Sequence, residues 1–389
     1  MSARGPLQGD GPLQGDGPPR GGGPLQGVRI LEVGGIGPNP FAGMLFADMG
    51  AEVLRIDRTP GAGVGQIGVA DPTLRGRQTL AVDLKTQRGL ELTRALARRA
   101  DALIEGFRPG VMERLGLGPQ ELARENPRLV YGRMTGYGQE GPLAQAAGHD
   151  INYVAVSGAL GATRRVGERP MFALNLVGDY GGGAMLLAFG VVCALLEARG
   201  SGRGQVVDAA MVDGVALMTS LVHGMHAAGM WSEAPGTNLL DSGSHFYEVY
   251  ETADGRHVAV GAIEPQFYSR LLELIGIPEA QMPQWERSRW PEFKARLAAA
   301  FAARPAAEWE ALLEGEETCA SLVRGPFEAP RHPHLAARGT FVELDGLLQP
   351  GPAPRFSRTP SRASAAQHDP RAALTRWGLS SAELQLLDG

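Results

Sequence analysis

Short apolar runs alternate with longer amphipathic runs through the first half of the chain. The short runs, rich in Val, Ile and Leu, predict strands at 28–33, 51–57, 79–84, 100–107 and 128–136. The longer runs predict helices at 40–50, 87–99, about 180–198 and about 206–225. Because strands and helices take turns in this order, we expect an α/β fold with a doubly wound parallel sheet.

The pattern changes near Trp231. Residues 245–263 alternate with period two around the turn "ADGR", which predicts a β-hairpin. Segments 265–276 and 290–315 have helical periodicity. We therefore expect a large α/β domain over 23–231 and a smaller α+β domain over 232–345. Residues 346–389 are expected to form a Pro- and Ser-rich linker and a last helix near Ala382 that returns to the large domain.

The chain begins with a repeat. "GPLQGD" occurs at 5–10 and again at 11–16, and "GPLQG" returns at 23–27. Such Gly- and Pro-rich copies cannot bury a core, so residues 1–22 are expected to be a disordered tail outside the fold.

The amino-acid composition disfavours several classes of partner and binding site. The net charge of −5 disfavours nucleic acid or an anionic membrane as the main partner, but a local arginine cluster could still bind an anionic small molecule. The two cysteines, Cys193 and Cys319, have no metal-binding spacing, and Cys193 is expected to be an inert core thiol. No signal peptide is visible, and the apolar run 184–196 is too short to span a bilayer. These features predict a cytoplasmic protein.

Common cofactor and catalytic motifs do not fit this sequence. "EVGGIGPNP" at 32–40 follows the first predicted strand, but it lacks the G-x-G-x-x-G spacing and two prolines interrupt it. The chain has no H-E-x-x-H, no G-x-S-x-G and no His–carboxylate metal set. Nicotinamide binding is therefore disfavoured.

Three ionisable residues stand out because each lies beside glycine or at the start of a helix. They are His149 in "GHDINY", Asp179 in "LVGDYGGGAM" and Glu264 in "VGAIEPQF". Each also has a structural interpretation: Asp179 and Glu264 as helix N-caps, and His149 as a half-buried packing residue. The adjacent glycines Gly181–Gly183 favour a ligand site at Asp179, since bare backbone lets a ligand approach N–H groups.

A wider set of strings carries a family resemblance. "ILEVGGIGPNPFAGMLFADMGAEVLRIDR", "RPGVMERLGLGP", "AGHDINYVAVSG", "LNLVGDYGGG" and "DGRHVAVGAIEPQFY" resemble the α-methylacyl-CoA racemases, which belong to the family III CoA-transferases. The resemblance covers roughly residues 24–360. It implies a Rossmann-like large domain and an interlocked homodimer. It also implies an active site between the large domain of one subunit and the small domain of the other.

The same resemblance assigns roles to residues. His149 and Asp179 match the family's two acid/base residues, and Glu264 matches the carboxylate that reaches the histidine from the other subunit. CoA contacts are implied at Arg58, Val82, Asp83, Leu84, Lys85, Arg108, Arg114, Gly148, Asp150, Ile151, Asn152 and Tyr153. For Arg58 and Arg114 alone, a solvated face is the alternative. Within the motif, contacts to CoA phosphates are favoured, because guanidinium groups bind phosphate oxygens in pairs.

Racemisation at Cα of a thioester fits these residue types. One group removes a proton from one face, and a second group delivers a proton to the other. Histidine titrates near neutrality, whereas Asp179 must be partly desolvated to act as a base. Backbone N–H groups near Asp179 are expected to stabilise the enolate oxygen. The reaction requires no metal or redox cofactor, and CoA is part of the substrate.

The sequence also departs from the family pattern. "LDSGSHFYEVY" stands where the racemases have a "DGGAPFY"-like loop, so Ser242, Ser244 and His245 are expected to make a bulkier, more polar wall for the acyl chain. The segment "CASLVRGPFEAPRHPH" lacks the usual Thr-Pro turn. Both differences concern the substrate more than the reaction type.

Two other functions stay open. The first is CoA transfer between carboxylic acids, with Asp179 as a nucleophile that forms a mixed anhydride. That reaction needs no second base across Cα, so His149 favours the racemase. The second is an inactive acyl-CoA-binding protein, which would have lost an ionisable member of the set.

Overall fold

The computed structural model of the chain describes residues 22–57 and 71–387. It consists of two compact units. The first contains the described residues up to Tyr153, Asn175–Val215 and the described residues from His334 onward, and the second contains Val154–Leu174 and Ala216–Pro333. Segments 154–174 and 216–231 thus fall in the second unit, whereas the sequence pattern grouped them with the large domain. Helical periodicity shows which side of a helix is apolar, but not which unit that side packs on.

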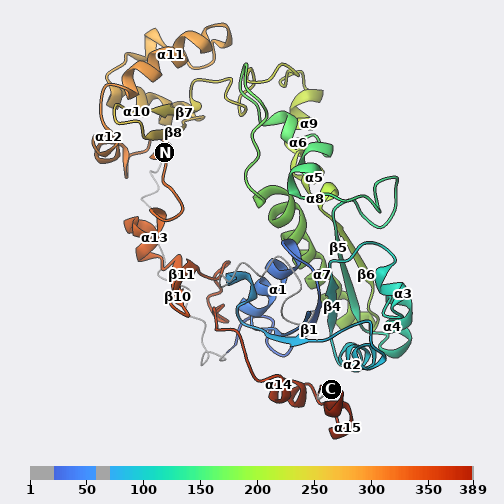
Figure 1. Cartoon of the computed structure of the whole chain (residues 1–389). Helices are drawn as coiled ribbons and strands as arrows, with labels where there is room; N and C mark the ends of the chain where they lie inside the picture. Colours follow the sequence, from blue (N-terminus) through green and yellow to red (C-terminus); the bar gives the residue numbers. More distant parts are fainter. Residues whose placement is uncertain (1–21, 58–70, 388–389) are drawn as a thin grey trace, which may run out of the picture. The chain divides into compact units, whose positions relative to one another are not determined.

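A six-stranded parallel sheet forms the centre of the first unit (Figure 1). Its strands are β1 (Arg29–Val33), β2 (Glu52–Asp57), β3 (Gln78–Ala81), β4 (Ala102–Glu105), β5 (Val130–Thr135) and β6 (Val206–Ala210). Their order is β3-β2-β1-β4-β5-β6, which is the order of a doubly wound sheet. The predicted parallel α/β fold is therefore confirmed.

Helices cover both faces of this sheet. One face packs on α1 (Pro38–Asp48) and α7 (Leu186–Ser201). The other face packs on α2 (Gln87–Ala97), α3 (Val111–Arg114), α4 (Pro119–Glu125) and α14 (Pro370–Arg376). Within β1, Ile30 belongs to the first core, while Leu31 and Val33 belong to the second. Burial on both faces explains why the inner strands β1, β2, β4 and β5 read as apolar runs, whereas the edge strand β3 alternates between buried and exposed residues.

The predicted helix at 206–225 is wrong in its first part. Its first five residues, "VVDAA", form β6 and pair in parallel with β5, from Tyr131↔Val206 to Thr135↔Ala210. Helices α8 (Met211–Met218) and α9 (Ser220–Ala227) follow. A short apolar run bordered by small residues fits a buried strand and a helix equally well, and the partner strand decides between them.

The apolar helix before β6 is longer than its sequence suggests. A π-helix, η3 (Leu176–Met185), runs directly into α7, giving 26 helical residues with a window of mean hydropathy 1.8. By length and composition this segment, unlike the run 184–196, could cross a membrane. Its buried side chains Leu187, Val191 and Ala194 belong to the sheet core, as in the core helix of a globular domain.

The second unit contains an antiparallel sheet in the order β7 (Tyr247–Glu251), β8 (His257–Gly261) and β9 (Ala320–Leu322). The β7–β8 pair confirms the predicted hairpin, with Glu251 opposite His257. Helices α10 (Pro265–Ile275), α11 (Trp290–Phe301) and α12 (Ala306–Leu313) share its apolar core. The helical run predicted at 290–315 breaks at Pro305, which cannot continue a helix.

Shorter elements complete the chain. They are α5 (Asp150–Val156), α6 (Ala159–Ala162), α13 (Pro333–Ala337), β10 (Phe341–Leu344), β11 (Leu347–Pro350) and α15 (Ser381–Leu384), with 3₁₀ turns at Pro72–Leu74, Glu279–Gln281, Arg287–Arg289, Ala329–Arg331 and Gln385–Leu387. Strands β10 and β11 form an antiparallel hairpin. Beyond it, Leu374 and Trp377 are fully buried beneath the central sheet.

Candidate functional site

A cavity of about 630 Å³ opens at the carboxyl ends of β1, β4 and β5. The strand order reverses between β1 and β4, and ligands of parallel α/β sheets bind at this kind of switch point. Lining residues follow each of the three strands and also come from the loop before α5, from η3 and from α8. They are Ile36, Gly37, Pro38, Asn39, Gly106, Phe107, Arg108, Pro109, Met134, Thr135, Gly136, Tyr137, Ala144, Ala146, Ala147, Gly148, His149, Asn152, Tyr153, Asp179 and Met211.

His149 lies on the cavity wall immediately before α5. Its backbone N–H donates to Asn152 Oδ1 at 3.0 Å, and its carbonyl accepts the N–H of Asn152 at 2.8 Å. These bonds fix the backbone, while the side chain remains exposed to the cavity. The predicted placement of His149 in a pocket is consistent with this geometry, and the interpretation as a half-buried packing residue is not.

Asp179 lies half-buried in the same cavity, in the first turn of the π-helix. Burial raises the pKa of its carboxyl, and the negative charge of Asp150 raises it further. The Asn175 amide, which donates to Oδ2 at 3.3 Å, and His149 act in the opposite direction. Asp179 is not a helix N-cap, because Asn175 occupies that position. π-helical turns of this kind occur frequently at functional sites.

Asp150 connects the two candidate bases. It directly follows His149, and its Oδ2 accepts the backbone N–H groups of Gly178 at 2.6 Å and Asp179 at 2.8 Å. Backbone N–H groups near Asp179 were expected to stabilise the enolate oxygen, but these two already donate to Asp150. That expectation is wrong for Gly178 and Asp179.

The glycines after Asp179 serve helix packing. A Cβ on Gly182 would lie 2.8 Å from the backbone nitrogen of Val215, and one on Gly183 would lie 2.9 Å from Met211 Cγ. Both glycines are buried. The expectation that they open the backbone to a ligand is therefore wrong, because side chains and backbone of α8 already fill that space.

One wall of the cavity comes from the loop after β1. Gly34, Gly35 and Gly37 all have positive φ, at 58°, 91° and 64°. Asn39 Nδ2 donates to the Gly34 carbonyl at 2.9 Å, and Arg55 Nη2 donates to the Gly35 carbonyl at 3.0 Å. This stretch lacks the spacing of a dinucleotide-binding loop, but its glycines at the end of a strand are the sequence signal that indicates a site.

Arg55 is itself held by two carboxylates, of which Glu32 is buried. Its guanidinium pairs with Glu32 and Asp57, and Glu32 also pairs with Arg77. Glu32 and Arg77 are completely buried. The loop that faces Asp179 is thus held by Arg55, which belongs to an ionic network with Glu32 and Arg77.

The loop after β4 forms the next part of the wall. Burial raises the pKa of Glu105 to about 7, against the opposing effects of the Phe107 N–H and the Arg133 guanidinium. The Phe107 N–H donates to Glu105 Oε2 at 2.7 Å. This bond orients the loop that carries Arg108 to the cavity.

The other residues implied by the resemblance divide into groups. Gly148, Asn152, Tyr153 and Arg108 line the cavity, whereas Ile151 and Arg114 are exposed and do not line it. Val82 is buried in the sheet core and Leu84 packs against that core. Asp83 accepts the backbone N–H of Lys85 at 2.9 Å in the turn before α2. Arg58 lies outside the described residues.

Glu264 belongs to the second unit and is not among the lining residues. It occupies the N-cap position of α10, with Pro265 next, but its side chain makes no capping hydrogen bond. The carboxylate is exposed. The position of Glu264 therefore fits the interpretation as a helix N-cap, but its side chain does not cap the helix.

The expectations for four individual residues need correction. Ser244 and His245 are fully buried in the core of the second unit, where His245 Nε2 lies 2.7 Å from the Tyr268 hydroxyl. Ser242 is bonded to Glu248. The side chains of this loop thus pack and bond within the second unit and do not form a polar wall. Cys193 is exposed on α7, not a core thiol.

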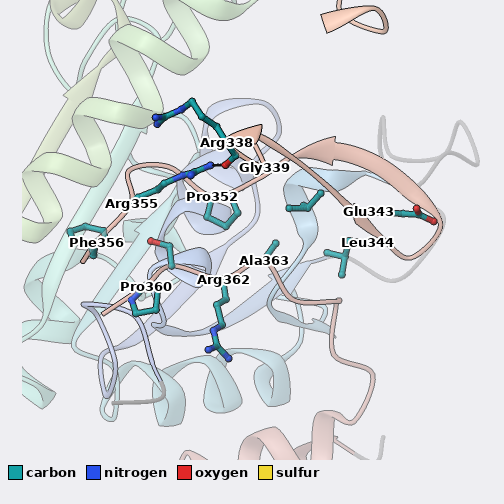
Figure 2. Close-up of a pocket in the computed structure, with 12 residues that line it drawn as sticks. Arg338, Gly339, Glu343, Leu344, Pro352, Arg355, Phe356, Pro360, Arg362 and Ala363 are labelled. Carbon is teal, nitrogen blue, oxygen red and sulfur yellow. Dashed lines mark hydrogen bonds between the residues drawn. The ribbon is translucent and has the colours of Figure 1, made fainter. Parts of the chain in front are cut away.

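A second cavity, of about 550 Å³, lies between the β10–β11 hairpin and residues 352–363. Three arginines line it, but Figure 2 shows the side chains of Arg338 and Arg362 directed away from each other. Arg355 donates to the Arg338 carbonyl. The arginines do not converge on one anion. Within residues 22–57 and 71–387, no group of three His, Cys, Asp or Glu side chains could hold a metal ion.

Comparison with known proteins adds independent information. The family model of CoA-transferase family III matches residues 25–372. α-Methylacyl-CoA racemase of Mus musculus is 43% identical over 92% of this chain and 95% of its own length. The Homo sapiens racemase is 43% identical over 87% of each chain. The crystal structure of Rv3272 from M. tuberculosis is 28% identical, with a TM-score of 0.73, and the match covers 89% of this chain and 98% of that one.

Proposed function

Because the chain belongs to CoA-transferase family III, we propose that it interconverts (R)- and (S)-2-methylacyl-CoA thioesters. Two relatives that are 43% identical over most of the chain carry the name α-methylacyl-CoA racemase. The observation that carries the proposal is the presence of two suitable groups, His149 and Asp179, in one cavity. Their charges interact, since His149 lowers the pKa that burial raises at Asp179.

The chemistry follows from the two side chains. One of them takes the Cα proton and leaves an enolate, and the other then gives its proton to the opposite face. No atom is oxidised or reduced, and the thioester stays intact. A raised pKa suits Asp179 to both roles, because a carboxyl that is protonated nearer neutrality can also act as an acid.

CoA is proposed to enter along the loops at the strand ends. Arg108 lies on the cavity wall and can pair with a phosphate. Arg58, Val82–Lys85 and Arg114 remain proposed contacts, as do Gly148, Ile151, Asn152 and Tyr153. Neither a metal nor a redox cofactor is part of the proposed reaction.

A homodimer is proposed to complete the site. Phe189, Val192 and Leu196 on α7, with Met185 just before it, form an apolar stripe, and Phe189 and Leu196 are 68% and 70% exposed. Exposed apolar stripes on a globular chain are typical of interfaces. In the dimer, the exposed carboxylate of Glu264 would come from the partner and stabilise the His149 imidazolium.

CoA transfer between carboxylic acids is the second candidate. Asp179 would attack the thioester carbonyl, release the CoA thiolate and form a mixed anhydride. The family name and the position of Asp179 on the cavity wall favour it. It assigns no second base to His149, which is why racemisation is preferred.

One experiment separates the two reactions. The wild-type chain is incubated in deuterium oxide with 2-methylacyl-CoA and a labelled free acid. Racemisation predicts deuterium at Cα of the recovered thioester. It also predicts that none of the labelled acid is converted to a CoA thioester. Labelled thioester without deuterium at Cα would establish the transferase instead.

A further inference from the structure

We propose that Asp150 is the positioning residue for Asp179, not a contact to CoA; this role rests on the proposed function of Asp179 as a catalytic base. A chain of hydrogen bonds links α5 to η3. Asp150 opens α5 directly after His149, and its carboxylate reaches the first turn of η3. One side chain thus ties the two candidate bases together.

The bonds leave little freedom at Asp179. A single oxygen of Asp150 accepts both N–H groups, Gly178 at 2.6 Å and Asp179 at 2.8 Å. A Cβ on Gly178 would lie 2.6 Å from that same oxygen, so the approach requires glycine. Asp150 is only 6% exposed, and a buried carboxylate bonded to two N–H groups is strongly held.

The residues near Asp150 in the sequence differ from it in whether they line the cavity. His149 and Asn152 line the cavity, whereas Asp150 does not. A carboxylate would also repel the phosphates of CoA, and here it already has two donors. Its side chain is therefore directed to the protein, while His149 and Asn152 face the cavity.

Asp150 also sets the electrostatic surroundings of Asp179. Asp179 interacts electrostatically with His149, Asp150 and Tyr153 and accepts a hydrogen bond from Asn175, and Arg108 interacts electrostatically with Tyr153. Asp150 is the negative one among them. Its charge holds the Asp179 pKa higher, and its hydrogen bonds hold the backbone. These two effects can be separated by substitution.

Two variants of Asp150 make the separation. Asp150→Asn keeps an oxygen that can accept both N–H groups but removes the charge. Asp150→Ala removes both. The matched control is Asp101→Asn, because Asp101 Oδ2 accepts the N–H of Arg29 at 2.8 Å at the opposite end of the sheet. All chains are first compared by circular dichroism and thermal unfolding.

The readout is α-proton exchange in deuterium oxide as a function of pH. The substrate is the epimer whose exchange persists in His149→Ala, in which Asp179 is the base. Asp150→Asn is expected to keep most of kcat and to move the acid limb of kcat/KM to lower pH. Asp150→Ala is expected to lose about 100-fold in kcat, with KM for acyl-CoA changed less than about 2-fold. Asp101→Asn should match the wild type.

A raised KM with an unmoved acid limb and unchanged kcat would overturn the proposal and make Asp150 a CoA contact. Unchanged kinetics in Asp150→Asn and Asp150→Ala would overturn it as well. If the wild type transfers CoA but exchanges no α-proton, the racemase proposal fails separately. The same variants in the transfer assay then decide whether Asp150 positions Asp179.

Discussion

Gly37 lies directly against the carboxylate of Asp179: a Cβ on Gly37 would be 2.9 Å from Oδ2. The close approach comes from the positive φ of 64° at Gly37, and the hydrogen bonds from Asn39 and Arg55 hold the loop in place. The wall of the cavity therefore sets where the Asp179 side chain can lie.

Gly37→Ala is expected to reduce kcat at least 10-fold, because the new methyl group displaces the Asp179 carboxylate. A control must carry the same backbone strain without the contact. Gly27 has a φ of 83° and no atom within 4 Å of a Cβ, so Gly27→Ala is matched. Each variant should lose about 1–2 kcal/mol of stability in urea. Equal activity in both would show that the contact with Asp179 is unimportant.

Glu32 is expected to be a major stabilising residue. Removing it leaves the guanidinium groups of Arg55 and Arg77 buried without this partner. Breaking such a buried pair typically costs about 3–5 kcal/mol, so Glu32→Ala should lower the urea midpoint strongly. Glu292→Ala breaks the exposed pair with Arg289 and should change the midpoint little. A small effect at Glu32 would mean that water replaces its carboxylate.

His245 makes the stability of the chain depend on pH. Burial, and then the nearby Lys294, lower the pKa of His245 from an ordinary 6.5 to about 3. A histidine with a lowered pKa binds its proton more tightly in the unfolded chain. Stability is therefore retained above pH 6.5 and lost as the pH falls from 6.5 toward 3.

The measurement compares unfolding at pH 7 and pH 5. His245→Gln is expected to lose about 2 kcal/mol less between these two values than the wild type, from about 1.4 kcal/mol per pH unit. Any constant packing cost of the substitution cancels in this difference. Equal losses in the two chains would show that His245 is hydrated in the native state.

The apolar stripe on α7 predicts the oligomeric state. Phe189→Asp or Leu196→Asp places a charge on this surface and should convert a dimer to monomers in sedimentation, with loss of activity. Arg203→Asp, after the end of α7, is the charge control. A wild-type chain that sediments as an active monomer would contradict the proposed shared site.

Local sequence signals were sufficient for most of the fold. Strands β1, β2, β4 and β5 were predictable because they are buried on both faces and read as apolar runs. Strand β6 was not, because "VVDAA" becomes a strand only through its pairing with β5. The hydrophobic periodicity of a short segment does not show which distant strand that segment pairs with.

The site was predictable only in part, for the same reason. Resemblance identified His149 and Asp179, and both line one cavity. The role of Asp150 depends on two N–H groups 28 and 29 residues away, and that of Gly37 on a contact with η3. His245 was expected to make its loop bulkier and more polar than that of the racemases, yet its ring packs against the rings of Phe246, Tyr268 and Phe293.

The two-base reaction is the central claim, and the single-base variants test it most directly. His149→Ala and Asp179→Ala are each incubated with (R)- and with (S)-2-methylacyl-CoA in deuterium oxide, and deuterium at Cα is followed by mass spectrometry. Both variants should lose racemisation by about 10²–10⁴-fold. Each should still exchange the epimer whose hydrogen faces the remaining base, so the preferred epimer should be opposite in the two variants. The same preferred epimer in both, or near wild-type racemisation by His149→Ala, would contradict the assignment.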